Sequence, residues 1–395
     1  MPKKVLFTAS TFSHIINFHL PYLRRFKGLG WQVHVACGGS LPAAEIAGAD
    51  VVFQLPLEKK MLAAGNFRAV GLLRKKIAAE QYALISTHTS LAAFFTRLAT
   101  PSLSGGGAWR PAVLNMVHGY LFDDQTKWAK RNILLTAEKL TAGRTDLLLT
   151  MNKWDLAAAR RYKLGGQIDF IPGVGVDFSR FAVIEGKNGK NEARAALGLR
   201  PQDYILIYAA EFSARKSQAV LLQAMAKLAE LGDLPKLARG GRLVLVLPGS
   251  GALLDECRQL AAKLELTQEG SARPLVMFPG QQHNIPQWYA AADAAVSASR
   301  SEGLPFNIME AMYAGLPVVA SRVKGHVDLL TENQTGLLYP YGDAAACAKQ
   351  LKRLWQETDL AQNLAENARK SVQQYSLTEV FPQVWAQYEK LITKS

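Results

Sequence analysis

The sequence predicts an α/β protein with two Rossmann-like, doubly wound domains, each built on a parallel sheet and facing a central cleft. Short runs rich in Val, Ile and Leu alternate with longer helical patterns along the chain. These runs lack clean polar–apolar alternation, which is typical of strands buried on both faces, and strands separated by helices form parallel sheets. A chain of 395 residues is too long for one ordinary core and suits two.

The expected strands occur in both halves of the chain. In the first half they are Val5–Thr8, Gln32–Ala36, Val51–Gln54, Ala83–Ser86, Val113–Val117 and Asp146–Met151. In the second half they are Tyr204–Ala209, Leu243–Leu247, Leu275–Phe278, Ala294–Ser297 and Pro317–Ala320. Ligands of open parallel sheets bind at the carboxyl ends of the strands, so functional residues are expected in the loops that follow them.

The joint between the domains is predicted within residues 171–194. This segment begins with IPGVGVD, in which Pro172 and Gly175 act as breakers, and continues into the polar run EGKNGKNE. We therefore expect a first domain over residues 1–175 and a second over residues 195–374.

Residues 375–395 are expected to form a final helix that packs back on the first domain. Ser376 and Glu379 have the spacing of a capping box at its start. Pro382 should kink this helix or confine its first turn.

Composition indicates a globular protein of a reducing compartment. Hydrophobic residues make up 49% and charged residues 20% of the chain. The stretch MPKKVLFTAS resembles a buried strand more than a signal peptide, and no run of about 18 apolar residues could span a membrane. The three cysteines lie far apart and have no metal-ligand spacing. We expect a cytoplasmic protein.

The net charge of +14 is concentrated in the first half of the chain. Residues 1–180 contain 23 Lys+Arg and 11 Asp+Glu, whereas the remainder contains 23 and 21. A one-sided positive field suggests an anionic surface or substrate on that side, although solvated helix faces explain any single cluster equally well. Nucleic acid is not expected, because no motif supports it and the aromatic residues do not interleave with the basic runs.

The most informative segment is VSASRSEGLPFNIMEAMYAGLPVVA, residues 296–320. It reads as the end of a buried strand, a turn, a helix that begins near Phe306 and a further buried strand. The amino end of such a helix presents backbone N–H groups and a positive dipole end, which favour phosphate. Gly303 in the turn allows a close backbone approach.

Two carboxylates flank this predicted phosphate site. Glu302 lies in the turn and Glu310 about one helical turn in. Carboxylates accept hydrogen bonds from pairs of sugar hydroxyls, which suits a ribose or a hexose. A general acid–base pair is a rival interpretation, and a helix cap at Glu302 with a surface acid at Glu310 is a purely structural one.

A second basic element, EFSARKSQ, follows the expected strand Tyr204–Ala209. Arg215 or Lys216 at that strand end could neutralise a diphosphate. An ordinary solvated loop is the alternative interpretation.

The segment EGLPFNIMEAMYAGLPVVAS resembles the E-x7-E signature of retaining glycosyltransferase family 4, which has the GT-B fold. The segments FTASTFSHIINFHLPYLRRFKGLGWQVHVA, STHTSLAAFFTRLA, NMVHGYLF, LLTMNKWD, IPGVGVDFSRF and ENQTGLLYPYGD resemble, in order, other blocks of its capsular and exopolysaccharide members. The resemblance thus spans nearly the whole chain, and the E-x7-E block is its most specific part.

This resemblance implies roles for the residues of the second half. Glu310 would hold the ribose of the donor nucleotide and Glu302 the hydroxyls of the donor sugar. The backbone N–H groups of Phe306, Asn307 and Ile308, beside Gly303, would hold the diphosphate. Lys216 would neutralise it, with or without Arg215.

The sequence departs from the family pattern at Glu211, where many members have Arg. A carboxylate cannot neutralise a diphosphate, so this task passes to Lys216, alone or together with its neighbour Arg215. Which of the two cations is the main one is left open.

Histidines follow or end strands of the first half. His118 would match the family's histidine beside the reacting sugar, where it would form a hydrogen bond rather than attack as a nucleophile. His14 and His88 are candidates for the acceptor side, or are structural histidines. They lack the spacing and carboxylate partners of a metal site, so no metal and no cofactor are expected.

The predicted reaction moves a sugar from a nucleotide diphosphate sugar, with UDP as the expected nucleotide, to a hydroxyl of a lipid-linked glycan in surface polysaccharide synthesis. Peripheral attachment to the cytoplasmic face of the inner membrane is expected through the faces of Phe18–Lys27 and Leu72–Lys76. The alternatives are a nucleotide-sugar epimerase of the same architecture and a non-enzymatic sugar-nucleotide-binding subunit.

Overall fold

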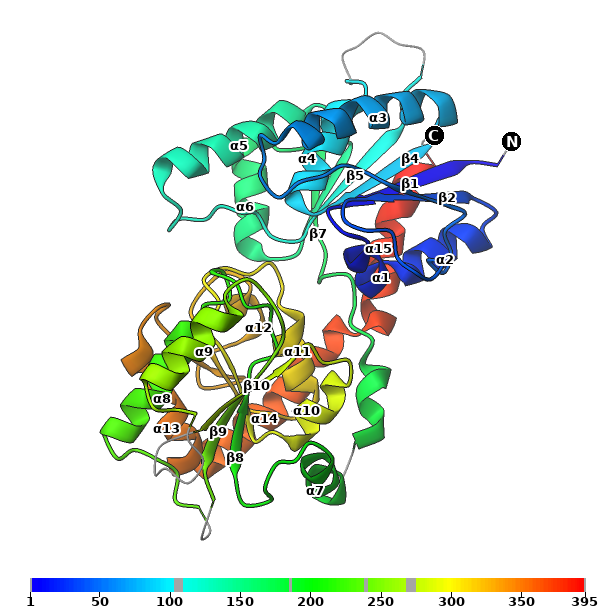
Figure 1. The fold of residues 1–395 in the computed structure, drawn as a ribbon. Coiled ribbons are helices and arrows are strands. Elements are labelled where there is room, and N and C mark those ends of the chain that lie inside the picture. Colours follow the sequence, from blue (N-terminus) through cyan, green and yellow to red (C-terminus); the bar gives the residue numbers. More distant parts are fainter. Residues whose placement is uncertain (1, 103–108, 185–186, 238–240, 268–274, 394–395) are drawn as a thin grey trace. The chain divides into compact units, whose positions relative to one another are not determined.

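The computed structural model describes residues 2–102, 109–184, 187–237, 241–267 and 275–393. The chain divides into two compact units (Figure 1). The first unit contains Met1–Gly175 and Leu377–Ser395, and the second contains Val176–Ser376.

The first unit is a parallel sheet of seven strands among the described residues, in the order β3-β2-β1-β4-β5-β6-β7. Its strands are β1 Lys4–Ala9, β2 Gln32–Cys37, β3 Val51–Gln54, β4 Leu84–His88, β5 Ala112–Val117, β6 Leu147–Thr150 and β7 Gln167–Phe170. Its helices are α1 Phe12–Phe18, α2 Leu20–Gly28, α3 Ala64–Glu80, α4 Ser90–Ala99, α5 Trp128–Ala142, α6 Lys153–Tyr162 and α15 Leu377–Ile392.

The second unit is a parallel sheet of six strands among the described residues, in the order β10-β9-β8-β11-β12-β13. Its strands are β8 Tyr204–Ile207, β9 Leu243–Pro248, β10 Leu275–Gly280, β11 Ala294–Ser297, β12 Val318–Ser321 and β13 Leu337–Tyr339. Its helices are η1 Phe178–Ile184, α7 Lys187–Ala196, α8 Gln218–Glu230, α9 Leu254–Lys263, α10 Ile285–Ala291, α11 Phe306–Tyr313, α12 His326–Leu329, α13 Ala344–Gln356, α14 Thr358–Val372 and η2 Gln373–Tyr375.

The carboxy-terminal helix α15 belongs to the first unit although the second unit precedes it in the chain. Its buried Tyr388 packs edge-on against Phe26 of α2, and the Tyr388 hydroxyl lies 2.8 Å from Ser86 Oγ of β4. Pro382 lies inside α15, beyond its first turn. The second unit starts before residue 195, because η1 and α7 both pack on α10.

Two strands were missed by the sequence analysis, and both are short or polar. β7 has the sequence QIDF, with its first and last residues exposed at the edge of the first sheet, so it has no apolar run. β13 has only three residues, LLY, although all three are buried. Neither pattern is long or apolar enough to be recognised without its neighbours.

Each sheet reverses the direction of its strand order at one place, between β1 and β4 in the first unit and between β8 and β11 in the second. The loops at the carboxyl ends of such strands diverge and leave room for a ligand. Among the described residues, no helix is both long and apolar enough to cross a membrane.

Candidate active site

Glu302, in the loop between β11 and α11, is held by two cations. Its Oε1 accepts a hydrogen bond from Lys216 Nζ and its Oε2 from Arg215 Nη1, both at 2.6 Å. The side chains of Glu302 and Lys216 are 7% and 11% exposed, whereas that of Arg215 is 46% exposed. Burial raises the pKa of the Glu302 carboxyl, but the charges of Lys216 and Arg215 outweigh this and lower its pKa to about 2. The three predicted residues therefore form one ionised cluster with an excess of one positive charge.

The loop that carries Lys216 is fastened to the loop that carries Glu302. The buried Tyr208, just after β8, donates its hydroxyl hydrogen to the Lys216 carbonyl at 3.1 Å, and its oxygen lies 2.8 Å from Ser299 Oγ. The Arg300 N–H donates to the Arg215 carbonyl at 2.7 Å. Because β8 and β11 are neighbours in the sheet, these contacts keep the cations beside the carboxylate. Tyr208 was not predicted as a site residue, because in the sequence it resembles an ordinary strand residue.

Gly325 and His326 support the Glu302 loop from the start of α12. Gly325 has a φ of +80°, and a Cβ added there would lie 2.8 Å from the Gly303 carbonyl oxygen. His326 is fully buried, and its Nδ1 donates to the Ser321 carbonyl at 2.7 Å. Burial lowers the pKa of His326 to about 4, so the ring is neutral near pH 7. The sequence analysis missed both residues, which lie more than twenty positions beyond the loop they support.

The start of α11 carries the residues predicted to bind a diphosphate. Asn307 Nδ2 donates to the Ala209 carbonyl at 3.2 Å, which ties the helix to the end of β8. The Ile308 N–H donates to Asn307 Oδ1 at 3.0 Å. An anion that uses the Ile308 N–H would therefore have to displace the Asn307 side-chain oxygen. Gly303 lies in the turn before α11, and Phe306 is the first residue of the helix, as predicted.

Glu310 lies half-buried one turn into α11. Burial raises the pKa of its carboxyl to about 7, although the charge of Arg180 acts in the opposite direction. Hydrogen-bond donors such as hydroxyls favour the ionised form of a carboxyl. Glu310 is thus a group whose charge depends on what binds to it near neutral pH.

In the first unit, the structure brings the predicted His14, His88 and His118 together and adds His19. The Nε2 atoms of His14 and His118 are 3.3 Å apart, and Nδ1 of His88 is 3.3 Å from His118 Nε2. His19 Nε2 lies 3.4 Å from His14 Nε2. Burial, together with the nearby histidines for His19, His88 and His118, lowers the pKa of all four rings, to about 4 for His14. His19 was overlooked because it sits between α1 and α2 and follows no strand.

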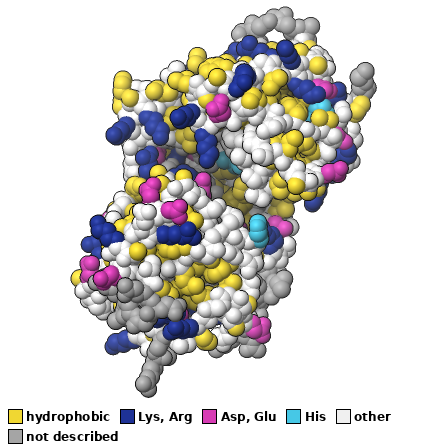
Figure 2. Space-filling view, in the orientation of Figure 1, with side chains coloured by type: hydrophobic (Ala, Val, Ile, Leu, Met, Phe, Trp, Pro, Cys, Tyr) yellow, Lys and Arg dark blue, Asp and Glu magenta, His cyan; other side chains and the backbone are white. Residues whose placement is uncertain are grey.

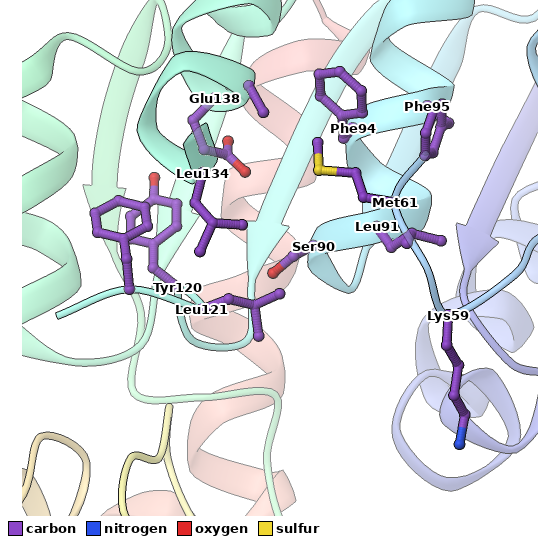
Figure 3. A pocket seen from close by; sticks show the side chains of 12 residues that line it. Lys59, Met61, Ser90, Leu91, Phe94, Phe95, Tyr120, Leu121, Leu134 and Glu138 are labelled. Carbon is purple, nitrogen blue, oxygen red and sulfur yellow. The ribbon is translucent and has the colours of Figure 1, made fainter. Parts of the chain in front are cut away.

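A second feature of the first unit is an apolar cavity of about 220 Å³ (Figure 3). Its lining residues come from α4, α5 and the loops after β3 and β5; they include Met61, Leu91, Phe94, Leu121 and Leu134. Glu138 also lines the cavity, but it forms a 2.8 Å ion pair with the fully buried Arg97. The cavity is therefore suited to an apolar group.

Comparison with known proteins supplies the family. Residues 189–371 match the family model described as glycosyl transferases group 1, and residues 20–173 match the glycosyl transferase 4-like domain. EpsD of Bacillus subtilis, which is named as a glycosyltransferase, is 30% identical over 100% of this chain and 99% of its own length. The chain belongs to glycosyltransferase family 4. As a family 4 glycosyltransferase it is a transferase enzyme.

A further sequence relative is also a glycosyltransferase, and solved structures show the same fold. An Escherichia coli enzyme named UDP-Gal:alpha-D-GlcNAc-diphosphoundecaprenol alpha-1,3-galactosyltransferase is 25% identical over 71% of this chain and 68% of its own. Sucrose-phosphate synthase from Thermosynechococcus elongatus superposes with a TM-score of 0.80 at 22% identity and covers both chains completely. Anabaena HepE, solved with UDP and glucose, has a TM-score of 0.75 at 20% identity and covers 98% of this chain and 100% of its own. These structures confirm the predicted GT-B fold, with one Rossmann-like parallel sheet in each unit.

Proposed function

We propose that this glycosyltransferase moves a sugar from a UDP-sugar to a hydroxyl of a lipid-linked glycan during polysaccharide synthesis, with retention of the anomeric configuration. The observation that carries the proposal is the ionised cluster of Glu302, Lys216 and Arg215 next to the start of α11. In this cluster, two cations that can bind a diphosphate lie beside a carboxylate that can accept hydrogen bonds from sugar hydroxyls.

Lys216 is the main cation in this proposal. Its side chain is almost buried. The ion pair with Glu302 and the hydrogen bond from the Tyr208 hydroxyl to the Lys216 carbonyl set its position. A fixed cation stabilises the charge that develops on the leaving diphosphate without reorganising during the reaction. Arg215 is half-exposed and would close over the outer phosphate oxygens.

The two carboxylates have separate tasks. Both oxygens of Glu302 accept hydrogen bonds from cations, yet an ionised carboxylate has about four acceptor sites, so it can also receive a sugar hydroxyl. Glu310 is proposed to accept from the ribose hydroxyls, which would hold it in its ionised form. The backbone N–H groups of Phe306–Ile308 would complete the diphosphate site.

His118 is proposed to lie beside the donor sugar and to form a hydrogen bond to it through Nδ1, because its Nε2 faces His14 and His88. It is half-buried at the carboxyl edge of the first sheet, directly after β5. No step of the transfer is assigned to a metal or cofactor.

The names of two relatives support the choice of substrates. The Escherichia coli enzyme is named for a UDP-sugar and a diphosphoundecaprenol acceptor, and HepE was solved with UDP. The apolar cavity of the first unit is our proposed site for part of the acceptor's lipid, because most of its lining is apolar and the charge of Glu138, which also lines it, is paired with Arg97.

Membrane attachment is proposed for the surface of α5 and the rim of the cavity. Leu62, Leu121, Trp128, Ile133 and Leu140 are large apolar side chains that are 55% to 84% exposed. The exposed Lys127 and Lys130 lie among them, and Figure 2 shows basic and apolar side chains mixed over the part of the first unit where Figure 1 draws α5. Basic residues near an anionic membrane contribute about 1 kcal/mol each.

Part of the surface first expected to meet the membrane is buried or paired within the first unit. Within Phe18–Lys27, Tyr22, Leu23 and Phe26 face the core. Lys27 pairs with Asp50, and Lys76 of the second expected face pairs with Glu80. Three apolar side chains of Phe18–Lys27 are therefore not available to lipid, whereas Leu72 of the second face is 50% exposed.

Flotation with vesicles tests the attachment. The wild-type chain should float with vesicles that contain anionic lipid and not with neutral ones. Trp128→Asp with Ile133→Asp should reduce flotation at least tenfold, whereas Arg24→Glu with Lys75→Glu, on the surface first expected, should reduce it less. Equal losses in both double variants, or equal binding to neutral vesicles, would reject the α5 surface.

A donor panel tests the transfer. UDP-sugars should raise the melting temperature more than GDP-sugars, since a ligand at 100 times its Kd adds about 2.7 kcal/mol. Release of UDP should depend on an added lipid diphosphate glycan, which also separates a transferase from an epimerase. Conversion of the donor sugar without acceptor, or donor binding without any turnover on such acceptors, would contradict the proposal.

A further inference from the structure

Four histidines of the first unit converge from four places in its chain. His14 lies on α1, His19 at the junction of α1 and α2, His88 at the end of β4 and His118 directly after β5. Each offers one ring nitrogen, and these four nitrogens lie within 4.8 Å of one another. Since β1, β4 and β5 are adjacent strands, the sheet topology itself brings these segments to one edge.

Three of the six distances between the ring nitrogens match the edges of a zinc coordination tetrahedron. Zinc–imidazole bonds of 2.0–2.1 Å place the nitrogens of a regular tetrahedron about 3.3–3.4 Å apart. The three nitrogen pairs in direct contact are 3.3, 3.3 and 3.4 Å apart. The remaining three pairs lie within 4.8 Å, and the rings of His19 and His88, whose centroids are 3.8 Å apart, have to turn to complete the tetrahedron.

Hydrogen bonds alone do not account for this arrangement. Each nitrogen of a neutral imidazole has one in-plane position, which holds either a hydrogen or a lone pair. His118 Nε2 contacts both His14 and His88, and His14 Nε2 contacts both His118 and His19. The three contacts form a chain of four nitrogens, so at most two of them can be good hydrogen bonds. A central cation uses all four lone pairs at once.

The surroundings hold the ring of His88 in the orientation that a ligand needs. Its Nε2 lies 3.0 Å from Ser86 Oγ, which is 2.8 Å from the Tyr388 hydroxyl. This leaves Nδ1 as the nitrogen turned toward His118. Phe7 stacks on the same ring with an interplanar angle of 8°. A metal-bound histidine commonly has its second nitrogen fixed by a hydrogen bond in this way.

We propose that His14, His19, His88 and His118 bind one Zn²⁺ ion in a four-coordinate structural site. Imidazole ligands suit zinc and related divalent transition metals, and a site closed by four protein ligands stabilises the fold rather than activating water. The ion joins the α1–α2 segment to the ends of β4 and β5. This inference rests on the first unit alone and does not depend on the transfer reaction.

This proposal departs from the sequence-based expectation, which was that these histidines bind no metal. His14 and His19 are five positions apart, His88 and His118 are distant, and all four lack the short spacings by which metal motifs are recognised. The ligands are assembled by the strand order of the sheet.

Metal analysis of the purified full chain tests the proposal. After equilibration with micromolar Zn²⁺ and gel filtration, the wild type should retain about one zinc per chain, and the X-ray absorption fine structure should fit four imidazole nitrogens at about 2.0 Å. Removing zinc with a chelator should lower the melting temperature, and Zn²⁺ should restore it. Co²⁺ in place of zinc should give the intense visible bands of a tetrahedral ion.

Matched variants separate the site from surface binding. His14→Asn, at the half-buried side of the cluster, should weaken zinc binding at least tenfold. His34→Asn changes a buried histidine of the same unit that contacts Tyr82 instead, and should leave the stoichiometry at one. Less than one tenth of a zinc per wild-type chain, equal affinity in both variants, or an oxygen-dominated absorption spectrum would overturn the proposal; the spectrum needs no variant and so decides the question even if a variant misfolds.

Discussion

Oε1 of Glu302 lies 2.6 Å from Nζ of Lys216, and both side chains are almost buried. The pair links the loop after β11 to the loop before α8, and the half-exposed Arg215 completes it from the outside. A buried carboxylate therefore positions the cation that we propose for the leaving diphosphate. This relationship governs how the site should respond to mutation and to pH.

Lys216→Ala should destabilise the second unit by about 3 kcal/mol, because it leaves the Glu302 charge buried without its closest partner. It should also lower kcat by about 100-fold, the usual effect of removing a group that stabilises transition-state charge. Urea denaturation and steady-state kinetics measure the two effects. Arg215→Ala is the matched control and should cost less than about 1 kcal/mol, since Arg215 is half-exposed. Equal losses of stability in the two variants would contradict the assignment of Lys216 as the more important partner of Glu302.

The stability contributed by Glu302 should disappear in acid. Its pKa in the folded chain, about 2, lies below the ordinary value of 4.5. The folded form therefore binds fewer protons than the unfolded form between these values, so its contribution is complete above pH 4.5 and is lost as the pH falls toward 2. Full loss amounts to about 3 kcal/mol. The difference in unfolding free energy between wild type and Glu302→Gln should shrink between pH 5 and pH 3, and a constant difference would count against the ionised cluster.

Nucleotide binding should strengthen as the pH rises through neutrality. Burial raises the pKa of Glu310 to about 7, and only the ionised carboxyl accepts from both ribose hydroxyls. The ionised fraction grows about tenfold between pH 6 and pH 8, so the Kd of UDP should fall by up to about tenfold over that range. Calorimetric titration measures this change. Glu310→Gln should bind UDP weakly and without this pH dependence. If the Kd of the variant still changed with pH as in the wild type, the effect would belong to the phosphate of UDP instead.

Because of the same raised pKa, Glu310 should lower the unfolding free energy of the chain without nucleotide at high pH. The folded chain binds more protons than the unfolded chain between pH 4.5 and 7, so the stability of wild type relative to Glu310→Gln should fall over this range and then level off. Addition of UDP should offset that fall. Stability curves at pH 5 and pH 8, with and without UDP, test the sign.

Gly325→Ala should be more harmful than Gly342→Ala, although both glycines have nearly the same positive φ. Gly325 has a φ of +80° and Gly342 a φ of +82°, so the backbone strain of about 1 kcal/mol is common to both. A Cβ at Gly325 would lie 2.8–2.9 Å from backbone and side-chain atoms of Gly303 and Glu302, whereas one at Gly342 has nothing within 4 Å. Gly325→Ala should therefore weaken donor binding at least tenfold, measured by thermal shift with a UDP-sugar, while Gly342→Ala should leave it unchanged. Equal donor affinity in both would show that the Gly325 contact does not set the Glu302 loop.

Sequence patterns were sufficient for most strands, because strands buried on both faces appear as continuous apolar runs. The edge strand β7 and the three-residue β13 escaped, since their hydrogen bonding to neighbours, not their composition, makes them strands. Glu302, Glu310 and Lys216 could be selected as candidates because they flank a strand–turn–helix pattern suited to phosphate. Their supports, Tyr208 and His326, could not, since a buried tyrosine and a buried histidine look like core residues in sequence.

The sequence by itself determined the α/β class, the family and the order of the blocks that carry chemistry, because apolar periodicity and the E-x7-E spacing are local properties of the chain. Only the tertiary structure decided that Glu302 is paired with Lys216 and that four histidines share one edge of the first sheet. The physical reason is that strand order, which the sequence does not display, determines which loops become neighbours. Charge pairing and metal coordination depend on distances of a few ångströms between such loops.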